Sequence, residues 1–170
     1  MDGFLNPQEI IKKLNLRQNM TVADFGCGAG GWAIPIAKIL EKGKVYAIDV
    51  LEEPLSALEG RAQLSGLQNI ERVLGDVEKG VKIPDESLDL VLMTNLLFEV
   101  ENIKRVLSEG KRVLKNGGRI LVVDWRKESS VGPDKRVDRK EVEEIATSLG
   151  LKIVEEFDAG NYHWGLILEK

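Results

Sequence analysis

The sequence predicts a doubly wound α/β fold with a seven-stranded, mostly parallel sheet. Three observations predict it. Apolar runs of strand length alternate with helical segments along most of the chain, and the run at 44–50 is apolar almost throughout. The last two runs follow each other with no helix between them. Such alternation is typical of sheets with helices on both faces, and the final pair is expected to form an antiparallel hairpin.

The first half of the chain starts with a helical lead-in over residues 1–20. Asn6 can cap a helix that begins at Pro7, with Glu9 three residues after the cap. A glycine-rich loop follows the first strand and leads into a helix with Pro35 near its first turn, where backbone donors are unpaired anyway. Gly43 is expected to end that helix. Strands are expected over Thr21–Phe25, 44–50, Ile70–Leu74 and Leu88–Thr94, and a second helix over 54–64.

The second half continues the alternation. Apolar residues from Ile103 to Leu114 fall at helical spacing, and the Asn-Gly-Gly sequence at 116–118 is expected to stop that helix. A polar loop over 126–137 precedes a helix capped by Asp138, with Glu141 three positions on. The remaining strands are expected over 119–124, 151–157 and 164–168.

Composition is that of a globular protein, with 43% hydrophobic and 31% charged residues among 170, which we interpret as one domain over 1–170. A net charge of -4 provides no general attraction to nucleic acid. Cys27 is the one cysteine, so neither an internal disulfide nor a multi-cysteine metal site is expected, and no metal is predicted. No apolar segment has the length of a membrane span and no signal peptide is apparent, which predicts a cytoplasmic protein. A monomer or homodimer is expected.

The glycine loop after the first strand has two candidate ligands. Gly26-x-Gly28-x-x-Gly31 matches the dinucleotide fingerprint, and Asp49 lies about 20 residues further on, where a ribose-binding acid belongs. Asp24, however, ends the first strand and is expected to face the ligand. A carboxylate would repel a pyrophosphate by roughly 4 kcal/mol at about 4 Å in an effective dielectric near 20.

S-adenosylmethionine suits these acids better, because it carries an ammonium, a sulfonium and no phosphate. Acids follow the first three strands: Asp24 toward the amino-acid end of the ligand, Asp49 toward the ribose hydroxyls and Asp76 toward the adenine. The terminal antiparallel strand is also unusual for a dinucleotide domain.

These features resemble a small class I S-adenosylmethionine-dependent methyltransferase of the menaquinone-biosynthesis or type 11 group. The stretches that carry the resemblance are 22–31, 45–49, 75–77, 88–95 and 112–121. The resemblance implies strand order 3-2-1-4-5-7-6, with strand 7 antiparallel. It also implies methyl transfer from S-adenosylmethionine, with S-adenosylhomocysteine as product.

The resemblance further implies which residues bind the cofactor. The methionine part would be held by Asp24, Gly26, Cys27, Gly28 and Gly30, the ribose by Asp49 beside Val50, the adenine by Asp76 and Val77, and the region of the sulfonium by the backbone of Asn95. Many relatives carry a histidine in the turn after strand four, where this chain has Phe98. No catalytic base is therefore assigned.

Aromatic residues near strand ends are candidates for an acceptor pocket, namely Trp32, Phe98, Trp125 and Tyr162. His163, the one histidine, either packs beside its aromatic neighbours or assists deprotonation together with Tyr162. Trp32 and Trp125 can equally be covering the edge of the sheet.

Several functions remain open at this point. A small-molecule acceptor is favoured, because no appended RNA-binding segment is apparent. The loop at 126–140 carries six basic residues, which could instead bind RNA or a protein substrate. A binding module without turnover is a third interpretation, and a nicotinamide oxidoreductase is the residual one.

Overall fold

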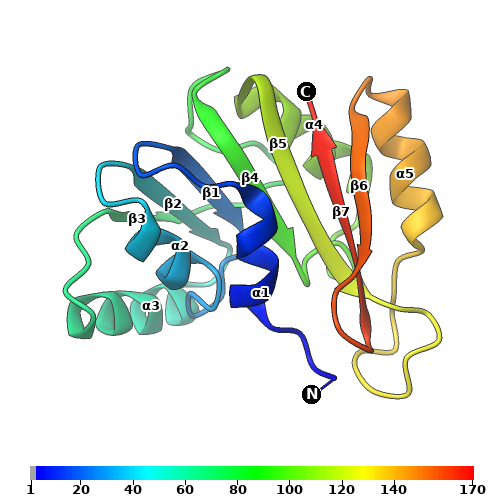
Figure 1. Cartoon of the computed structure of the whole chain (residues 1–170), viewed down its shortest axis with the longest axis horizontal. Coiled ribbons are helices and arrows are strands. Elements are labelled where there is room, and N and C mark those ends of the chain that lie inside the picture. The colour runs from blue at the N-terminus through cyan, green and yellow to red at the C-terminus, as the bar shows by residue number, and fades with distance from the viewer. Residues whose placement is uncertain (1–2) are drawn as a thin grey trace.

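A computed structural model describes residues 3–170 as seven strands in one sheet with helices on both faces (Figure 1). The strand order is β3-β2-β1-β4-β5-β7-β6, and β7 runs antiparallel to both of its neighbours. The predicted fold class, strand order and antiparallel strand are confirmed. The strands are β1 Thr21–Phe25, β2 Lys44–Asp49, β3 Ile70–Leu74, β4 Leu88–Thr94, β5 Leu114–Trp125, β6 Lys152–Asp158 and β7 His163–Glu169.

The helices divide between the two faces of the sheet, since successive side chains of a strand point to opposite faces. Val22 of β1 packs into the cluster beneath the first three helices, whereas Ala23 and Phe25 pack into the cluster beneath the last two. Both clusters are fully apolar at their centres, which is why the central strands carry apolar residues at almost every position. The helices are α1 Pro7–Ile11, α2 Ala33–Ile39, α3 Glu52–Leu64, α4 Ile103–Val113 and α5 Arg139–Ser148, with a 3-10 turn at Lys12–Leu14 after α1.

Three element boundaries differ by more than one residue from the sequence-based expectation. Helix α2 ends at Ile39, before Gly43. Position 43 requires a glycine because a Cβ there would collide with the carbonyl oxygen of Met20. Helix α3 begins at Glu52, two residues before Pro54, since proline is tolerated throughout a first turn. Strand β5 begins already at Leu114, because Gly117 N–H donates to Lys170 O at 2.9 Å and so extends the strand.

Helix caps agree better with expectation. The side chain of Asn6 accepts from Gln8 N–H at 3.0 Å at the start of α1. Asp138 accepts from Lys140 N–H at 3.0 Å at the start of α5. Between residues 3 and 170 there is no helix with the length and apolar character that crossing a membrane requires.

Candidate functional site

The carboxyl ends of β1, β2, β3 and β4 meet at one edge of the sheet and surround a cavity of about 390 Å³. Ligands of open α/β sheets bind at this edge, and the volume lies within the range of small-molecule sites. Among the described residues that line the cavity, the charged side chains are two carboxylates, those of Asp49 and Glu99. The lining residues are Gly26, Cys27, Gly28, Trp32, Ile48, Asp49, Val50, Leu51, Pro54, Gly75, Val77, Thr94, Asn95, Leu96 and Glu99.

The glycine loop forms one wall. Gly26 and Cys27 both donate their N–H groups to Ile48 O at 2.9 Å, which ties the loop to β2. Gly28 has φ 51°, and a Cβ there would meet no atom within 4 Å, so its backbone faces open space. Backbone without a side chain permits close approach of a ligand. Gly30 does not line the cavity and packs toward Leu58.

Cys27 contributes its backbone to this loop, while its side chain is buried. Burial raises the pKa of the Cys27 thiol, and the charges of Asp24 and Asp49 raise it further. The thiol is therefore neutral and acts as a small packing group.

Asp49 is held between two turns. Its Oδ2 accepts from Gly28 N–H at 2.9 Å, and its Oδ1 accepts from Leu51 N–H at 3.1 Å. Val50 and Leu51 are exposed beside it at 59% and 60% of their surfaces. The carboxylate thus lies on the cavity wall next to two largely exposed apolar side chains.

Asp24 is fully buried and does not line the cavity, contrary to the expectation that it faces the ligand crevice. It shares a face of the sheet with Val22, where α2 covers it. Neither carboxylate oxygen has a hydrogen-bond partner among residues 3–170. Burial raises the pKa of Asp24 to about 7, against the lowering effect of the nearby Ala33 N–H, and the charge of Asp49 raises it as well.

Asp76 also lies off the cavity wall, although its neighbours Gly75 and Val77 line it. The Asp76 carboxylate pairs with Lys79 Nζ at 3.0 Å and accepts from Glu78 N–H at 2.9 Å. The ammonium of Lys79 and this N–H lower the pKa of Asp76. In the structure this acid stabilises its own turn, and a contact with adenine stays a prediction.

The turn after β4 forms the opposite wall. Asn95 adopts a left-handed conformation with φ 50°, and its N–H donates to Val123 O at 2.8 Å. Its Oδ1 is buried without a hydrogen-bond partner among the described residues. A buried polar atom without a partner is costly unless a ligand or water satisfies it.

Asp124, at the end of β5, anchors this turn and was not singled out from the sequence. Its Oδ2 accepts from Leu97 N–H at 2.9 Å, and its Oδ1 accepts from Trp125 N–H at 2.8 Å. Burial raises the pKa of Asp124 to about 6, while these N–H donors lower it. The available signal was an acid that ends an apolar strand, as Asp24 and Asp49 do.

The candidate acceptor residues do not all meet at the cavity. Trp32 lines it and is 7% exposed, whereas Phe98, Trp125, Tyr162 and His163 do not line it. Tyr162 packs against Phe4, with ring centroids 5.2 Å apart. This placement argues against an acceptor pocket built from Tyr162, because its ring is occupied elsewhere.

His163 lies in the core, with its ring centroid 4.1 Å from that of Trp125 and 2% of its surface exposed. Burial lowers the pKa of His163 to about 4, and the charge of Arg126 lowers it further. The imidazole is therefore neutral at physiological pH and enclosed. The packing interpretation of His163 agrees with this geometry better than the catalytic one.

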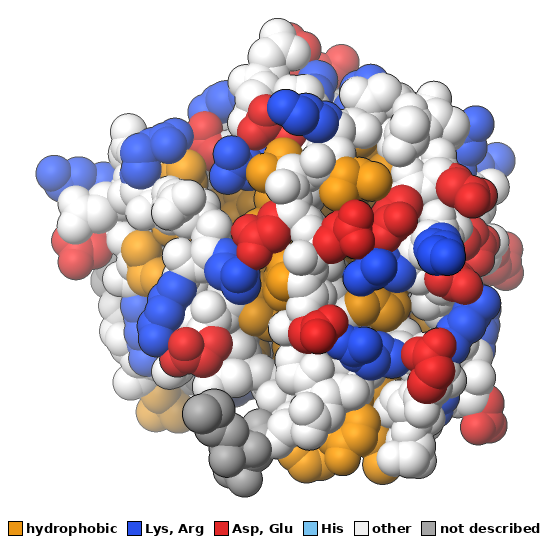
Figure 2. Space-filling view, turned by 45° about the vertical axis from the view of Figure 1, so that its right-hand side comes forward, with side chains coloured by type: hydrophobic (Ala, Val, Ile, Leu, Met, Phe, Trp, Pro, Cys, Tyr) orange, Lys and Arg blue, Asp and Glu red, His pale blue; other side chains and the backbone are white. Residues whose placement is uncertain are grey.

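The basic loop at 126–140 uses most of its charges internally. Arg126 pairs with Asp158, Lys127 with Asp138 at 2.9 Å, and Arg139 with Glu143 at 2.9 Å. Lys135 Nζ donates to Val100 O at 2.9 Å. Arg136 donates to four carbonyl oxygens of the same loop, those of Lys127, Ser129, Val131 and Pro133. On the face in Figure 2, basic and acidic side chains are interspersed and do not gather by sign.

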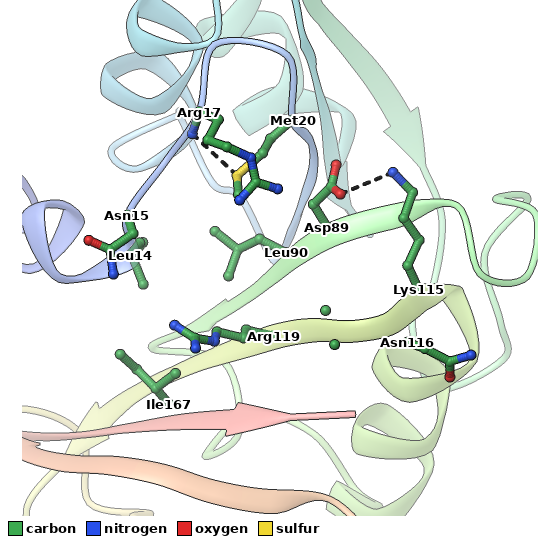
Figure 3. A pocket seen from close by; sticks show the side chains of 12 residues that line it. Leu14, Asn15, Arg17, Met20, Asp89, Leu90, Lys115, Asn116, Arg119 and Ile167 are labelled. Atoms are coloured by element: carbon green, nitrogen blue, oxygen red, sulfur yellow. Dashed lines mark hydrogen bonds and ion pairs between the residues drawn. The ribbon is translucent and has the colours of Figure 1, made fainter.

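Other hollows lie outside this cavity, and two of them are lined in part by residues between 6 and 20. One, of about 330 Å³, opens at the amino ends of β1, β4 and β5 (Figure 3), where Asp89 pairs with Lys115 at 3.0 Å and accepts from Thr21 N–H at 2.8 Å. The other is an open groove between α1 and α2. Neither lies at the carboxyl edge of the sheet, where the acids converge.

Comparison with known proteins identifies the family. A family model described as a methyltransferase domain matches residues 16–163. A crystal structure of a SAM-dependent methyltransferase from Aquifex aeolicus is 30% identical, with a TM-score of 0.89 over 98% of this chain and 90% of that one.

Curated relatives agree in chemistry but are longer. The demethylmenaquinone methyltransferase of Geobacillus sp. (strain WCH70) is 25% identical over 126 residues, 74% of this chain and 53% of that protein. The corresponding enzyme of Listeria welshimeri is 30% identical over 118 residues, 69% of this chain and 50% of that protein. The chain spans about half the length of these relatives. From the domain match, the strand order and the Aquifex structure together, the chain belongs to the class I S-adenosylmethionine-dependent methyltransferases.

Proposed function

We propose that this protein binds S-adenosylmethionine in the cavity at the carboxyl edge of the sheet and transfers its methyl group to a small-molecule acceptor. One observation carries the proposal: the charged side chains on the cavity wall, Asp49 and Glu99, are both acids. A dinucleotide pyrophosphate would meet a carboxylate and no cation there, a repulsion of roughly 4 kcal/mol at about 4 Å in an effective dielectric near 20. A cationic ligand without phosphate is attracted by the same groups.

The residues present suit this cofactor. Asp49 offers carboxylate oxygens for the ribose hydroxyls, and the exposed side chains of Val50 and Leu51 offer an apolar surface for the adenine, with Val77 opposite. Gly28 has no side chain and lets the methionine part approach the loop closely, and the backbone of Asn95 is assigned to the region of the sulfonium. We assign Gly26, Cys27 and Gly30 to the same part through the loop, and Asp76 to the adenine.

We assign Asp24, which lies buried beneath the glycine loop, as the counter-charge for the ammonium of the cofactor. Its carboxylate has no partner among the described residues, so the ammonium of the cofactor would be a favourable counter-charge. The cofactor itself supplies an activated methyl group with a good leaving group. The protein then contributes proximity and alignment for in-line displacement.

Two observations support a small-molecule acceptor. The relatives are named as demethylmenaquinone methyltransferases, which act on a small molecule. Among the six basic side chains of the 126–140 loop, five have partners within the protein, which leaves little free positive charge for an RNA backbone.

A thermal-shift panel tests the cofactor. S-adenosylmethionine and S-adenosylhomocysteine at 100 times Kd are each expected to stabilise the folded protein by about 2.7 kcal/mol, while NAD leaves Tm unchanged. Stabilisation by NAD alone would overturn the proposal. Labelled methyl transfer into fractionated metabolites, RNA and protein then tests the acceptor, with label expected in the metabolite fraction.

A further inference from the structure

The hollow at the amino ends of β1, β4 and β5 has a surplus of positive charge (Figure 3). Three cations line it, Arg17, Lys115 and Arg119, against one carboxylate, that of Asp89. Its volume of about 330 Å³ lies within the range of small-molecule sites. The hollow opens at the edge of the sheet opposite to the glycine loop, so an occupant there leaves the cofactor cavity free.

The two arginines of this hollow have free donors. The guanidinium of Arg17 makes no ion pair or hydrogen bond among residues 3–170, and its backbone N–H donates to the sulfur of Met20 at 3.5 Å (Figure 3). Arg119 donates from Nε to Glu169 at 3.1 Å, while its two terminal nitrogens have no partner in the described part of the chain. A free guanidinium matches the oxygens of a phosphate or a carboxylate. Both arginines can therefore bind an anion without breaking a contact of the fold.

The acids near these cations are already paired. Asp89 Oδ1 pairs with Lys115 Nζ at 3.0 Å, and its Oδ2 accepts from Thr21 N–H at 2.8 Å. The charge of Asp89 is thus balanced by Lys115 and is not left facing Arg17 alone. Glu169 lies outside the lining and balances part of the charge of Arg119. With both acids counted, the charge of Arg17 stays uncompensated.

Backbone hydrogen bonds hold both walls of the hollow. Met20 N–H donates to Arg17 O at 3.1 Å and closes the turn that precedes β1. At the start of β5, Gly117 N–H donates to Lys170 O at 2.9 Å, and Lys170 N–H donates to Gly118 O at 3.0 Å. Gly117 has φ 76°, and a Cβ there would meet no atom within 4 Å, so this stretch of backbone is open to a ligand. A site with fixed walls loses little conformational entropy when it binds.

The remaining lining suits an organic group attached to an anion. Leu90 and Ile167 form an apolar floor and are 3% and 2% exposed. Asn15 and Asn116 add side-chain amides that make no hydrogen bond with other residues between 3 and 170. The hollow is also larger than a single phosphate group. These features favour a small compound over a bare ion.

We propose that this hollow is a binding site for a small organic phosphate monoester, whose phosphate group is bound by Arg17 and Arg119. At pH 7 such a group carries about 1.5 to 2 negative charges and three acceptor oxygens. Both properties match the surplus of positive charge and the two guanidinium groups, which come from different segments of the chain. A carboxylate has one charge and two oxygens, so it satisfies fewer of these donors. The site is independent of the proposed methyltransferase function.

Binding measurements on the full chain test the class of ligand. Calorimetry and Tm are recorded with inorganic phosphate and glucose 6-phosphate, and with glucose, citrate and sodium chloride at matched ionic strength. Both phosphates are expected to bind and to raise Tm, while glucose and chloride leave it unchanged. NAD has no monoester phosphate and is expected to stay without effect. No binding of glucose 6-phosphate, an equal rise with chloride, or a rise with citrate alone would overturn the proposal.

Substitutions in the hollow locate the binding. Arg17→Ala is expected to weaken glucose 6-phosphate binding by about 10-fold or more, the usual loss for a hydrogen bond to a charged group. Asp89→Asn keeps an oxygen for Thr21 N–H and removes a negative charge, so binding should tighten. Arg105→Ala is the matched control, because Arg105 is an exposed arginine outside the hollow whose guanidinium also makes no ion pair or hydrogen bond within residues 3–170. Equal affinity of Arg17→Ala and the wild type would show that the phosphate binds elsewhere and would refute the site.

Amide chemical shifts of the ¹⁵N-labelled protein locate the ligand without substitution. Glucose 6-phosphate is expected to shift signals of residues 14–20 and 115–119, which line or adjoin the hollow. The signals of residues 26–28 in the glycine loop should stay in place, because that loop lines the other cavity. Shifts confined to the glycine loop would place the phosphate in the cofactor cavity and contradict the proposal.

Discussion

Three aspartates that end strands at the same edge of the sheet have different chemistry because their surroundings differ. Asp49 lines the cavity and accepts two backbone N–H groups. Asp124 is buried and holds a turn, and Asp24 is buried without a partner among residues 3–170. A sequence pattern identifies all three as acids after apolar strands, but solvent access and hydrogen bonding decide which of them can meet a ligand.

Removing the Asp49 carboxylate is expected to weaken cofactor binding. Asp49→Ala removes an acceptor of charge-assisted hydrogen bonds, so the affinity for S-adenosylhomocysteine should fall by about 1.5–3 kcal/mol in calorimetry. Glu53→Ala is the control, because Glu53 is an exposed acid in the first turn of α3 and lies outside the cavity. Equal affinities for Asp49→Ala and the wild type would refute the assignment.

Asp24 is expected to make folding stability pH-dependent. Its pKa is about 7 in the folded protein, whereas the ordinary pKa of an aspartate is 3.8, so between these values the folded state holds a proton that the unfolded state has lost. The contribution of Asp24 to stability is therefore present at low pH and falls as pH rises from about 4 to about 7, by about 4 kcal/mol at most.

Asp24→Asn removes that titration, so its free energy of unfolding relative to the wild type should increase between pH 5 and pH 8 in urea denaturation. Asp124 titrates in the same direction, with a pKa of about 6, but it is present in both proteins and cancels. A difference between the two proteins that does not change with pH would exclude a protonated, buried Asp24.

At the scale of elements, the 126–137 loop is ordered by Arg136. The planar guanidinium donates to four carbonyl oxygens at 2.7 to 3.2 Å, a geometry that a lysine ammonium cannot reproduce. The basic side chains that suggested a nucleic-acid surface instead make contacts within the loop and with β6, β7 and the start of α5.

Arg136→Ala is accordingly expected to lower the free energy of unfolding by about 1–3 kcal/mol and to speed amide exchange across the loop. Arg136→Lys should behave almost like the alanine variant. Lys140→Ala, whose exposed side chain makes no ion pair or hydrogen bond within residues 3–170, should behave like the wild type. Similar exchange in all four proteins would show that the guanidinium does not order the loop.

At the scale of the whole molecule, the net charge provides no general attraction to RNA. The net charge is -4, and basic side chains are mixed with acidic ones on the face in Figure 2. Because backbone recognition of nucleic acid depends on free cations, we expect RNA to bind weakly.

RNA binding measured by fluorescence anisotropy at 50 and 200 mM salt is expected to be undetectable at the higher concentration. A basic RNA-binding domain in the same buffers is the control. Binding that persists at 200 mM salt and weakens steeply with further salt, as for several phosphate contacts, would favour an RNA substrate instead.

Much of the fold could be predicted because local chemistry dictates it. The apolar runs, the cap residues Asn6 and Asp138, and the missing helix before β7 are local signals, and the resemblance supplied the order of the strands. The predicted boundaries near Gly43 and Leu114 were wrong because contacts with distant segments decide them. Gly43 lies against a carbonyl oxygen of another segment, and the start of β5 pairs with the end of the chain.

The sequence by itself determined the glycine loop, the acids that end the strands and the class of cofactor they favour. Only the tertiary structure decided which of those side chains lines the cavity. Asp24, Asp76 and His163 lie off the wall, while Glu99 lies on it. The physical reason is that burial and orientation depend on residues distant in the chain, such as α2 above Asp24 and Trp125 against His163.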